Sequence, residues 1–195
     1  MLSNQINIIA EIGWNHMGDM NLAKKMIDSA VKNGADICKF QTWSEKKLGK
    51  GSWDNDERRE IYKKAELSKK QHVELNNYCR AKKVKFLSSV FDDDGIGIMS
   101  SINPEMVKIA SQELYNLNLI TACLEKFNKV IISTGASKWE EILKLTNIKN
   151  KEKIIVMHCV SSYPCKPENV NMPKMKKLQE FFPVVGYSGH YAGID

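Results

Sequence analysis

The stretch KVIISTG, residues 129–135, has the pattern that decides the fold class. Its apolar, β-branched residues run directly into Ser133 and a glycine, which predicts a short buried strand ending in a polar loop. A continuous apolar run, unlike an alternating one, is typical of a parallel strand covered on both faces. The same pattern recurs in INIIAEIG (6–13), DICKFQT (36–42), VKFLSSVF (84–91), MVKIAS (106–111), KIIVMHCV (153–160) and VVGYSGH (184–190).

Between these predicted strands, apolar residues recur at helical spacing. Strand followed by helix, repeated, predicts either a (β/α) barrel or a doubly wound sheet. The longest gap, residues 43–83, is predicted to hold an extended loop and one or two helices, and such loops often carry specificity. The helical positions are Leu22, Met26, Ile27 and Ala30, then Leu117, Ile120 and Leu124, and then Ile142 with Leu145.

Length and composition favour one ordinary domain. At 195 residues and 43% hydrophobic, the chain can bury a sizeable core. No segment approaches the roughly 20 apolar residues of a membrane span, and the start lacks the pattern of a secretory signal, so we expect a cytoplasmic protein without membrane contact. The five cysteines are odd in number and have no CxxC spacing. We therefore expect reduced thiols that act as small hydrophobes, without disulfides or structural zinc.

The net charge of +6 comes from dispersed lysines. Nucleic-acid binding favours a compact basic stripe with interleaved aromatic residues, and this sequence lacks one, so a nucleic-acid partner is not expected. The positive charge can attract a small anionic substrate, although a solvated lysine-rich surface needs no function.

Polar groups stand at the carboxyl end of nearly every predicted strand. In a (β/α)8 barrel these ends surround a single site, whereas an open sheet would spread them along an edge, so the barrel is favoured. For any one residue, the alternative is that a strand end is simply where polar residues begin. The groups are Glu11, Lys39 with Gln41, Ser89, Lys108 with Ser111, Ser133, His158, and Ser188 with His190.

Two lysines, Lys39 and Lys108, come from the second and fourth predicted strands. Together with the hydroxyls of Ser89, Ser111 and Ser133 they predict an anion cradle, because phosphate and carboxylate oxygens require several donors and positive charge. The alternative is that either lysine pairs with Glu11 or Glu113 at the rim. Glu11, in a glycine-containing loop, is expected to stay ionised and either to orient sugar hydroxyls or move a proton, or to be a structural partner of lysine.

Among the histidines, His190 is the candidate metal ligand, since neutral imidazole at a strand end binds divalent transition ions. One histidine does not make a metal site. His158 is the second candidate, but its apolar surroundings favour a hydrogen-bonded core residue. His16 and His72 show no ligand spacing, and His72 is expected on a lysine-rich helical face.

Seven motifs, in this order, closely resemble the N-acetylneuraminate (sialic acid) synthase family, which includes the legionaminic and pseudaminic acid synthases. The resemblance runs from about residue 6 to the end. The combination is highly specific, although each piece alone is weak. The motifs are AEIGWNHMGD (10–19), ADICKFQT (35–42), AELS (65–68), VKIASQEL (107–114), VIISTG (130–135), HCVSSYP (158–164) and VVGYSGHYAG (184–193).

The resemblance implies a (β/α)8 TIM-type barrel that condenses phosphoenolpyruvate with an N-acetylmannosamine-type amino sugar, giving a sialic acid-type nonulosonate and phosphate, with Mn2+ or Mg2+ as cofactor. Ser89 stands where the family usually has threonine, and Ser161 where one branch has asparagine. By this carry-over, Glu11, Glu113 and Lys108 are catalytic, His190 binds metal, and the substrate-binding residues are Lys39, Gln41, Ser89, Ser111, Ser133, Ser161, Tyr163 and Ser188.

Two departures from the family pattern stand out. Gly189 replaces the aspartate of the usual GxSDH motif, which removes a carboxylate beside His190. Family members also continue through an eighth strand, a second metal-binding histidine and a small C-terminal antifreeze-like domain. The expectation is therefore a single domain, residues 1–195, with about seven of the eight βα units.

Three functional alternatives remain open on the sequence. The chain is a fragment or one half of a split synthase completed by a C-terminal polypeptide, a weak relative that binds phosphoenolpyruvate, or a non-catalytic module that pairs with an intact synthase. A homodimer is a further expected partner arrangement.

Overall fold

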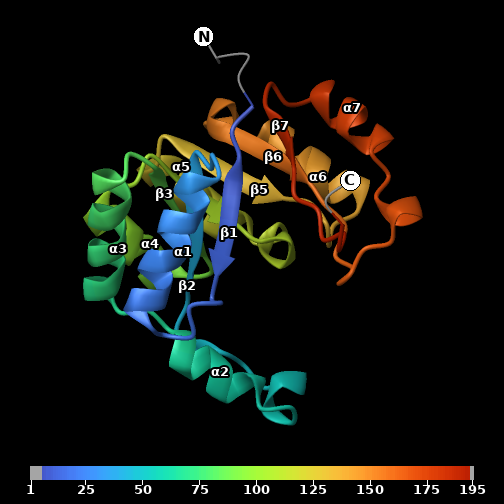
Figure 1. The fold of residues 1–195 in the computed structure, drawn as a ribbon. Coiled ribbons are helices and arrows are strands. Elements are labelled where there is room, and N and C mark those ends of the chain that lie inside the picture. Colours follow the sequence, from blue (N-terminus) through green and yellow to red (C-terminus); the bar gives the residue numbers. More distant parts are fainter. Residues whose placement is uncertain (1–5, 194–195) are drawn as a thin grey trace. The chain divides into compact units, whose positions relative to one another are not determined.

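The computed structural model describes residues 6–193, and the chain divides into two compact units, Met1–Glu105 and Met106–Asp195. Each unit consists of parallel strands that follow one another in chain order, with helices between them (Figure 1). All seven predicted strands are present within one to three residues of their expected bounds. The predicted alternation of strand and helix is confirmed.

The first unit contains β1 (Ile9–Gly13), β2 (Ile37–Thr42) and β3 (Lys85–Val90), with β2 paired to both neighbours. The helices α1 (Met20–Lys32), α3 (Lys69–Ala81) and α4 (Asp93–Ile102) pack with these strands, and α1 contacts α3 (Figure 1). Helix α1 begins where the Asp19 carboxylate accepts hydrogen bonds from two backbone N–H groups, and Ser68 with Gln71 forms a capping box at α3.

The predicted long loop after β2 is confirmed, and it contains the 3₁₀ turns η1 (Glu45–Lys47) and η2 (Ser52–Asp54) and helix α2 (Arg58–Ala65). Arg59 holds this segment together: its guanidinium donates to Glu45 Oε1 at 2.6 Å and to the Gly49 carbonyl at 2.9 Å, and it pairs with Asp54. A guanidinium with five donors can bridge three separate loop positions in this way. The sequence between β2 and α3 is therefore an ordered segment.

The second unit contains β4 (Met106–Ile109), β5 (Lys129–Ser133), β6 (Ile154–His158) and β7 (Val185–Tyr187), all parallel. Its α-helices are α5 (Leu117–Lys126), α6 (Trp139–Leu143) and α7 (Pro173–Gln179), and α7 packs against β6 and β7. Short 3₁₀ turns fill the connections: η3 (Ser111–Glu113), η4 (Lys144–Asn147), η5 (Lys151–Lys153) and η6 (Pro167–Asn169).

Burial explains why the strand runs are continuously apolar. Four residues of two neighbouring strands are fully buried: Val107 and Ile109 of β4, and Val130 and Ile132 of β5. Ile131, which lies between the last two on β5, is 2% exposed. Residues of both faces of these strands are thus removed from water, as expected for parallel strands with helices on one face. Alternation along each strand then decides which residues share the face opposite the helices.

His72 corrects one expectation from the sequence. The sequence predicts His72 on a lysine-rich helical face, but its ring is completely buried. His72 Nδ1 lies 3.0 Å from the Ser68 carbonyl and Nε2 lies 2.9 Å from Thr42 Oγ1, whose hydroxyl lies 2.7 Å from Ser88 Oγ. Both ring nitrogens therefore have hydrogen-bond partners, which offset the loss of water around the buried imidazole.

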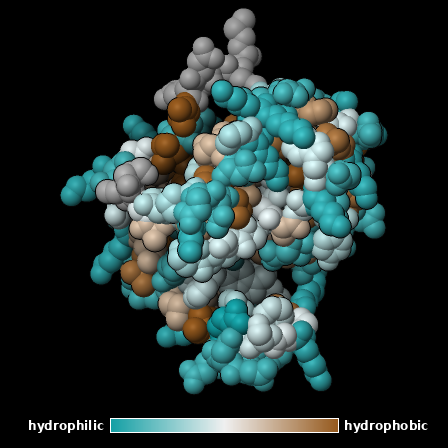
Figure 2. All heavy atoms as spheres, turned by 90° about the vertical axis from the view of Figure 1, so that its right-hand side faces the viewer, coloured by the Kyte–Doolittle hydropathy of each residue, from teal (hydrophilic) through white to brown (hydrophobic). Residues whose placement is uncertain are grey.

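The face of the molecule that Figure 2 shows is largely polar. On the face shown in Figure 2, hydrophilic side chains spread between smaller apolar groups. Among residues 6–193, no helix combines the length and apolar character needed to cross a membrane. All five cysteines are buried and none of them is part of a disulfide bond, in agreement with the expectation that they act as small hydrophobes.

Candidate active site

Four predicted site residues of the first unit share one face of its strands. Glu11 is the register partner of Lys39, and Gln41 is the register partner of Ser89. Since Lys39 and Gln41 are two residues apart on β2, their side chains point to the same side. The structure therefore brings Glu11, Lys39, Gln41 and Ser89 together as one set.

Lys39 is paired in this set. Its ammonium forms an ion pair with the Glu11 carboxylate, and the two side chains are 7% and 48% exposed. This is the arrangement that the sequence left open as an alternative, a lysine held by a rim glutamate. The half-exposed carboxylate places the pair at the edge of the buried face, where a ligand can reach it.

A β-bulge shapes the end of β1. The register between β1 and β2 shifts between Glu11 and Gly13, and Gly13 has a positive φ of 56°. A Cβ at Gly13 would lie 3.2 Å from Glu11 Oε1, 3.7 Å from Gln41 Nε2 and 3.9 Å from Asn15 Nδ2. Bulges of this kind re-aim side chains beside functional sites. Here the bulge gathers one carboxylate and two amides around a glycine.

The second unit has a corresponding face. Lys108 is the register partner of Ile131, and Ser133, two residues further on, is the partner of Met157. Met157 in turn is the partner of Gly186. By alternation the side chains that continue this face beyond the strand ends are those of Cys159 and Ser188. Cys159 was not among the predicted site residues.

Lys108 is partly buried, and within residues 106–193 no aspartate or glutamate forms an ion pair with it. Burial lowers the pKa of its ammonium below the usual 10.5, and the charge interaction with Cys159 acts in the opposite direction. A buried cation without a counter-ion is costly, and a bound anion removes that cost. The lysine is therefore placed as an anion-binding residue would be.

Hydroxyl and thiol groups lie together at the ends of β4, β5 and β6. Ser111 Oγ accepts a hydrogen bond from the Gly135 amide at 3.1 Å and lies 3.2 Å from Cys159 Sγ. A Cβ at Gly135 would lie only 2.7 Å from Ser161 Oγ and 2.8 Å from Cys159 Sγ. We call Ser111, Gly135, Cys159 and Ser161 the hydroxyl–thiol cluster. It brings two predicted substrate-binding serines together.

Ser133 Oγ is buried and, within the part of the chain that the structure describes, has no hydrogen-bond partner. Such an atom is unusual in a folded protein and requires an explanation, of which an absent ligand is one. Glu113, at the end of η3, is partly buried, and no residue from 106 to 193 makes a hydrogen bond or ion pair with its carboxylate. Ser188 is fixed through its backbone amide, which donates to the His158 carbonyl at 2.9 Å.

His190 has the hydrogen-bond pattern of a metal ligand. Its Nδ1 lies 2.9 Å from the Val160 carbonyl, which can only accept, so Nδ1 carries the proton and Nε2 keeps its lone pair. The ring lies 4.0 Å, between centroids, from that of Tyr163, which is 75% exposed. Within residues 6–193, no three His, Cys, Asp or Glu side chains form a group that can hold a metal ion. The residues fit one ligand of the implied Mn2+ or Mg2+ ion and not a complete site.

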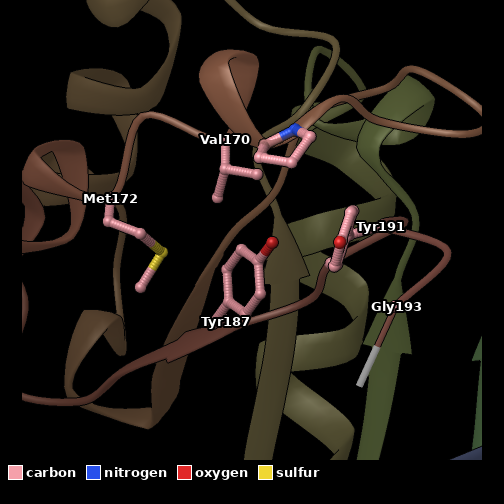
Figure 3. A pocket seen from close by; sticks show the side chains of 7 residues that line it. Val170, Met172, Tyr187, Tyr191 and Gly193 are labelled. Carbon is pink, nitrogen blue, oxygen red and sulfur yellow. The ribbon is translucent and has the colours of Figure 1, made fainter. Parts of the chain in front are cut away.

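The ring of Tyr187 occupies the space beside Gly189 where a side chain would lie. A Cβ at position 189 would lie 2.5 to 2.7 Å from the Oη, Cε1 and Cζ atoms of Tyr187. Tyr187 also lines an open groove of about 630 Å³ together with Tyr191, Val170 and Met172 (Figure 3). The groove does not include Lys108, Ser111 or Ser133. The departure from the family motif therefore accompanies the presence of a bulky ring two residues earlier.

His158 lies in the core, as the sequence favoured. It is 1% exposed, and its Nε2 lies 2.7 Å from the Val170 carbonyl. Its Nδ1 is buried without a partner among the described residues, so only one of the two ring nitrogens is hydrogen-bonded.

Cys159 is a site residue that the sequence did not indicate. Its position next to Ser111 in space distinguishes it from the other buried cysteines, and no sequence spacing indicates that contact.

Comparison with known proteins agrees with this geometry. A model of the NeuB family matches residues 26–195. N,N'-diacetyllegionaminic acid synthase of Campylobacter jejuni is 36% identical over 204 residues, covering 96% of this chain and 61% of that protein. Pseudaminic acid synthase of Helicobacter pylori is 33% identical over 201 residues, covering 95% and 59%. This chain thus spans about three fifths of the length of these curated relatives.

The crystal structure of N-acetylneuraminic acid (sialic acid) synthetase from Leptospira borgpetersenii, in complex with citrate, has 34% identity and a TM-score of 0.90, covering 98% of this chain and 67% of that one. With the seven parallel strands and their helices, this likeness confirms the predicted TIM-barrel type of fold. The family match extends over most of the chain, and the chain belongs to the NeuB family.

Proposed function

We propose that this chain binds phosphoenolpyruvate and serves in its condensation with an N-acetylmannosamine-type amino sugar, giving a sialic acid-type nonulosonate and phosphate. The observation that carries the proposal is Lys108, a partly buried ammonium without a carboxylate partner within residues 106–193. It lies on the same strand face as the Ser133 hydroxyl, which has no hydrogen-bond partner among the described residues. Relatives named as legionaminic and pseudaminic acid synthases support the product class.

The two units offer two different sets of polar side chains. Lys108, Ser111, Ser133 and Ser161 in the second unit offer one cation and several hydroxyl donors, a set that suits phosphate and carboxylate oxygens. In the first unit, Lys39 is paired with Glu11 beside Gln41, a set that offers both donors and acceptors to sugar hydroxyls.

In the proposed reaction, the enol carbon C3 of phosphoenolpyruvate attacks the sugar aldehyde, and a carbon–carbon bond forms while the aldehyde oxygen takes up a proton. Water then adds to C2, and the tetrahedral intermediate releases phosphate with cleavage of the C2–O bond. Glu11 and Glu113 are the carboxylates proposed to move these protons. Lys108 and the serines would hold the anionic groups in place throughout.

The divalent metal stays a prediction. His190 would supply one nitrogen ligand, which suits Mn2+ better than the oxygen-preferring Mg2+. A bound ion of this kind polarises a carbonyl as a Lewis acid. A homodimer or a complementing C-terminal polypeptide is likewise proposed as a partner.

The test is an assay of phosphate release from phosphoenolpyruvate with N-acetylmannosamine and related amino sugars. It is run with Mn2+ or Mg2+, and with and without the C-terminal part of a full-length relative. Sugar-dependent phosphate release supports the proposed condensation. Phosphoenolpyruvate binding without any release in either arm would replace it with the non-catalytic binding alternative.

A further inference from the structure

Cys159 follows the last residue of β6 and is 3% exposed. Its Sγ lies 3.2 Å from Ser111 Oγ, and the Ser111 oxygen also accepts from the Gly135 amide at 3.1 Å. The sulfur is also near enough to the Lys108 ammonium to influence its pKa. The thiol therefore lies beside two groups that are proposed to hold phosphoenolpyruvate.

The number of lone pairs on Ser111 makes this contact consequential. A serine hydroxyl has one proton to donate and two lone pairs that accept. The Gly135 amide occupies one lone pair of Ser111 Oγ. A second donor at the other lone pair would leave the hydroxyl proton as the only remaining hydrogen-bonding capacity of Ser111.

We propose that Cys159 is that second donor, a positioning residue whose thiol proton points at Ser111 Oγ and thereby turns the Ser111 hydroxyl into an obligate donor toward an oxygen of phosphoenolpyruvate. This inference rests on the proposed function. A hydroxyl gains more from a charged oxygen than from neutral sulfur, since charge-assisted hydrogen bonds are roughly twice as strong. A bound anion thus favours thiol to hydroxyl to anion over the reverse direction.

The absence of a side chain at Gly135 leaves room for the Cys159 sulfur. The position of a Cβ at Gly135 is 2.8 Å from Cys159 Sγ, 2.7 Å from Ser161 Oγ and 3.2 Å from Ser111 Oγ, so three side chains converge on the bare Cα. Because glycine leaves this space open, the thiol can approach Ser111 closely. This close approach of Cys159 to Ser111 gives Cys159 a role different from that of a small core hydrophobe.

The experiment measures phosphoenolpyruvate affinity by isothermal titration calorimetry for wild type, Cys159→Ala, Cys159→Ser and Cys123→Ala. Loss of one orienting hydrogen bond is expected to weaken Cys159→Ala about 3- to 10-fold. Cys159→Ser keeps a donor and is expected to stay within about 2-fold of wild type. Cys123, a buried thiol of α5, is the control for removing a sulfur from the same unit, and its variant should bind like wild type.

A double-mutant cycle with Ser111 separates positioning from general damage. If Cys159 acts through Ser111, Cys159→Ala causes no further loss of affinity in a Ser111→Ala background. Thermal unfolding of each variant shows whether it folds, and the Cys159→Ser rescue remains informative if the alanine variant is unstable.

The outcomes distinguish this inference from the proposed function. Wild-type protein without phosphoenolpyruvate affinity overturns the proposed function, and the positioning role falls with it. Wild-type binding together with an unaffected Cys159→Ala, an equally weakened Cys159→Ser, or an additive double mutant overturns the positioning role alone. Rescue by serine combined with non-additivity supports it.

Discussion

The ammonium of Lys39 forms an ion pair with the carboxylate of Glu11, its register partner on the neighbouring strand. Lys39 is almost entirely buried, and the Glu11 carboxylate compensates its charge. Lys108 of the second unit has no such partner within residues 106–193. The two lysines that look alike in the sequence are therefore in different electrostatic situations.

Glu11→Gln is expected to lower the free energy of unfolding by about 1 to 3 kcal/mol, because it removes the negative charge that pairs with the buried Lys39 ammonium. Urea unfolding at neutral pH measures this. The control is Glu74→Gln, which breaks the exposed pair of Lys24 and Glu74, with 30% and 43% exposed side chains, and should cost at most about 1 kcal/mol. Equal losses in the two variants would contradict the buried role of Lys39.

Lys108→Met should separate binding from stability. We expect phosphoenolpyruvate affinity to fall at least about 30-fold, since a charge that contacts the anion is lost. Stability against urea should equal or exceed that of wild type, because the removed cation is partly buried and has no carboxylate partner within residues 106–193. Lys149→Met, at an exposed position, controls for the change in net charge.

The same lysine predicts a pH dependence. Burial lowers the pKa of Lys108 from 10.5, so its positive charge is lost at a lower pH than that of an ordinary lysine. Anion affinity of wild-type protein should therefore fall as the pH rises through the alkaline range below 10.5. An arginine at position 108 keeps its charge over this range. Calorimetric titrations at a series of pH values should therefore find that the anion affinity of Lys108→Arg, whether equal to or weaker than that of wild type, does not change with pH. A flat wild-type profile would contradict the lowered pKa.

Two buried histidines predict acid sensitivity of the first unit. Burial lowers the pKa values of His16 and His72 below 6.5, so the unfolded chain binds more protons than the folded one below that pH. Their contribution to stability is complete above pH 6.5 and is lost as the pH falls toward the folded pKa values, by up to about 1.4 kcal/mol per histidine at pH 5.5. Urea unfolding at pH 7.5 and 5.5 measures the loss, and His72→Gln should show a smaller one.

Gly135→Ala is expected to damage the hydroxyl–thiol cluster, since the added Cβ would lie within 2.7 to 3.2 Å of three side-chain atoms. Both thermal stability and phosphoenolpyruvate affinity should fall. Gly97 on α4 provides a matched control, because a Cβ there meets nothing within 4 Å. Gly97→Ala should raise stability by about 0.5 to 1 kcal/mol through helix propensity.

The sequence predicts the strands well because burial on both faces leaves a direct trace in composition. Runs such as that of β5 need apolar residues at every position, and parallel pairing then brings their carboxyl ends to one side. The polar residues at those ends followed from the same reasoning: Lys39 and Gln41 do share a face, and so do Lys108 and Ser133.

Contacts between residues distant in the chain were beyond sequence reasoning. Helical spacing could not reveal that His72 reaches Thr42, 30 residues away, and is buried by that contact. In the sequence, nothing distinguishes Cys159 from the other buried cysteines. Only the structure shows its sulfur beside Ser111, 48 residues earlier. Local patterns specify elements, whereas partners across elements depend on how those elements pack.

The contact of Tyr187 with Gly189 imposes an order on the mutations available to this loop. A lineage that acquired an acidic residue at position 189 first would pass through a protein with two groups competing for one volume, whereas loss of the aromatic ring first opens the room. Natural variants with aspartate at 189 should therefore carry either a slim residue at 187 or an aromatic ring that is turned away from this position.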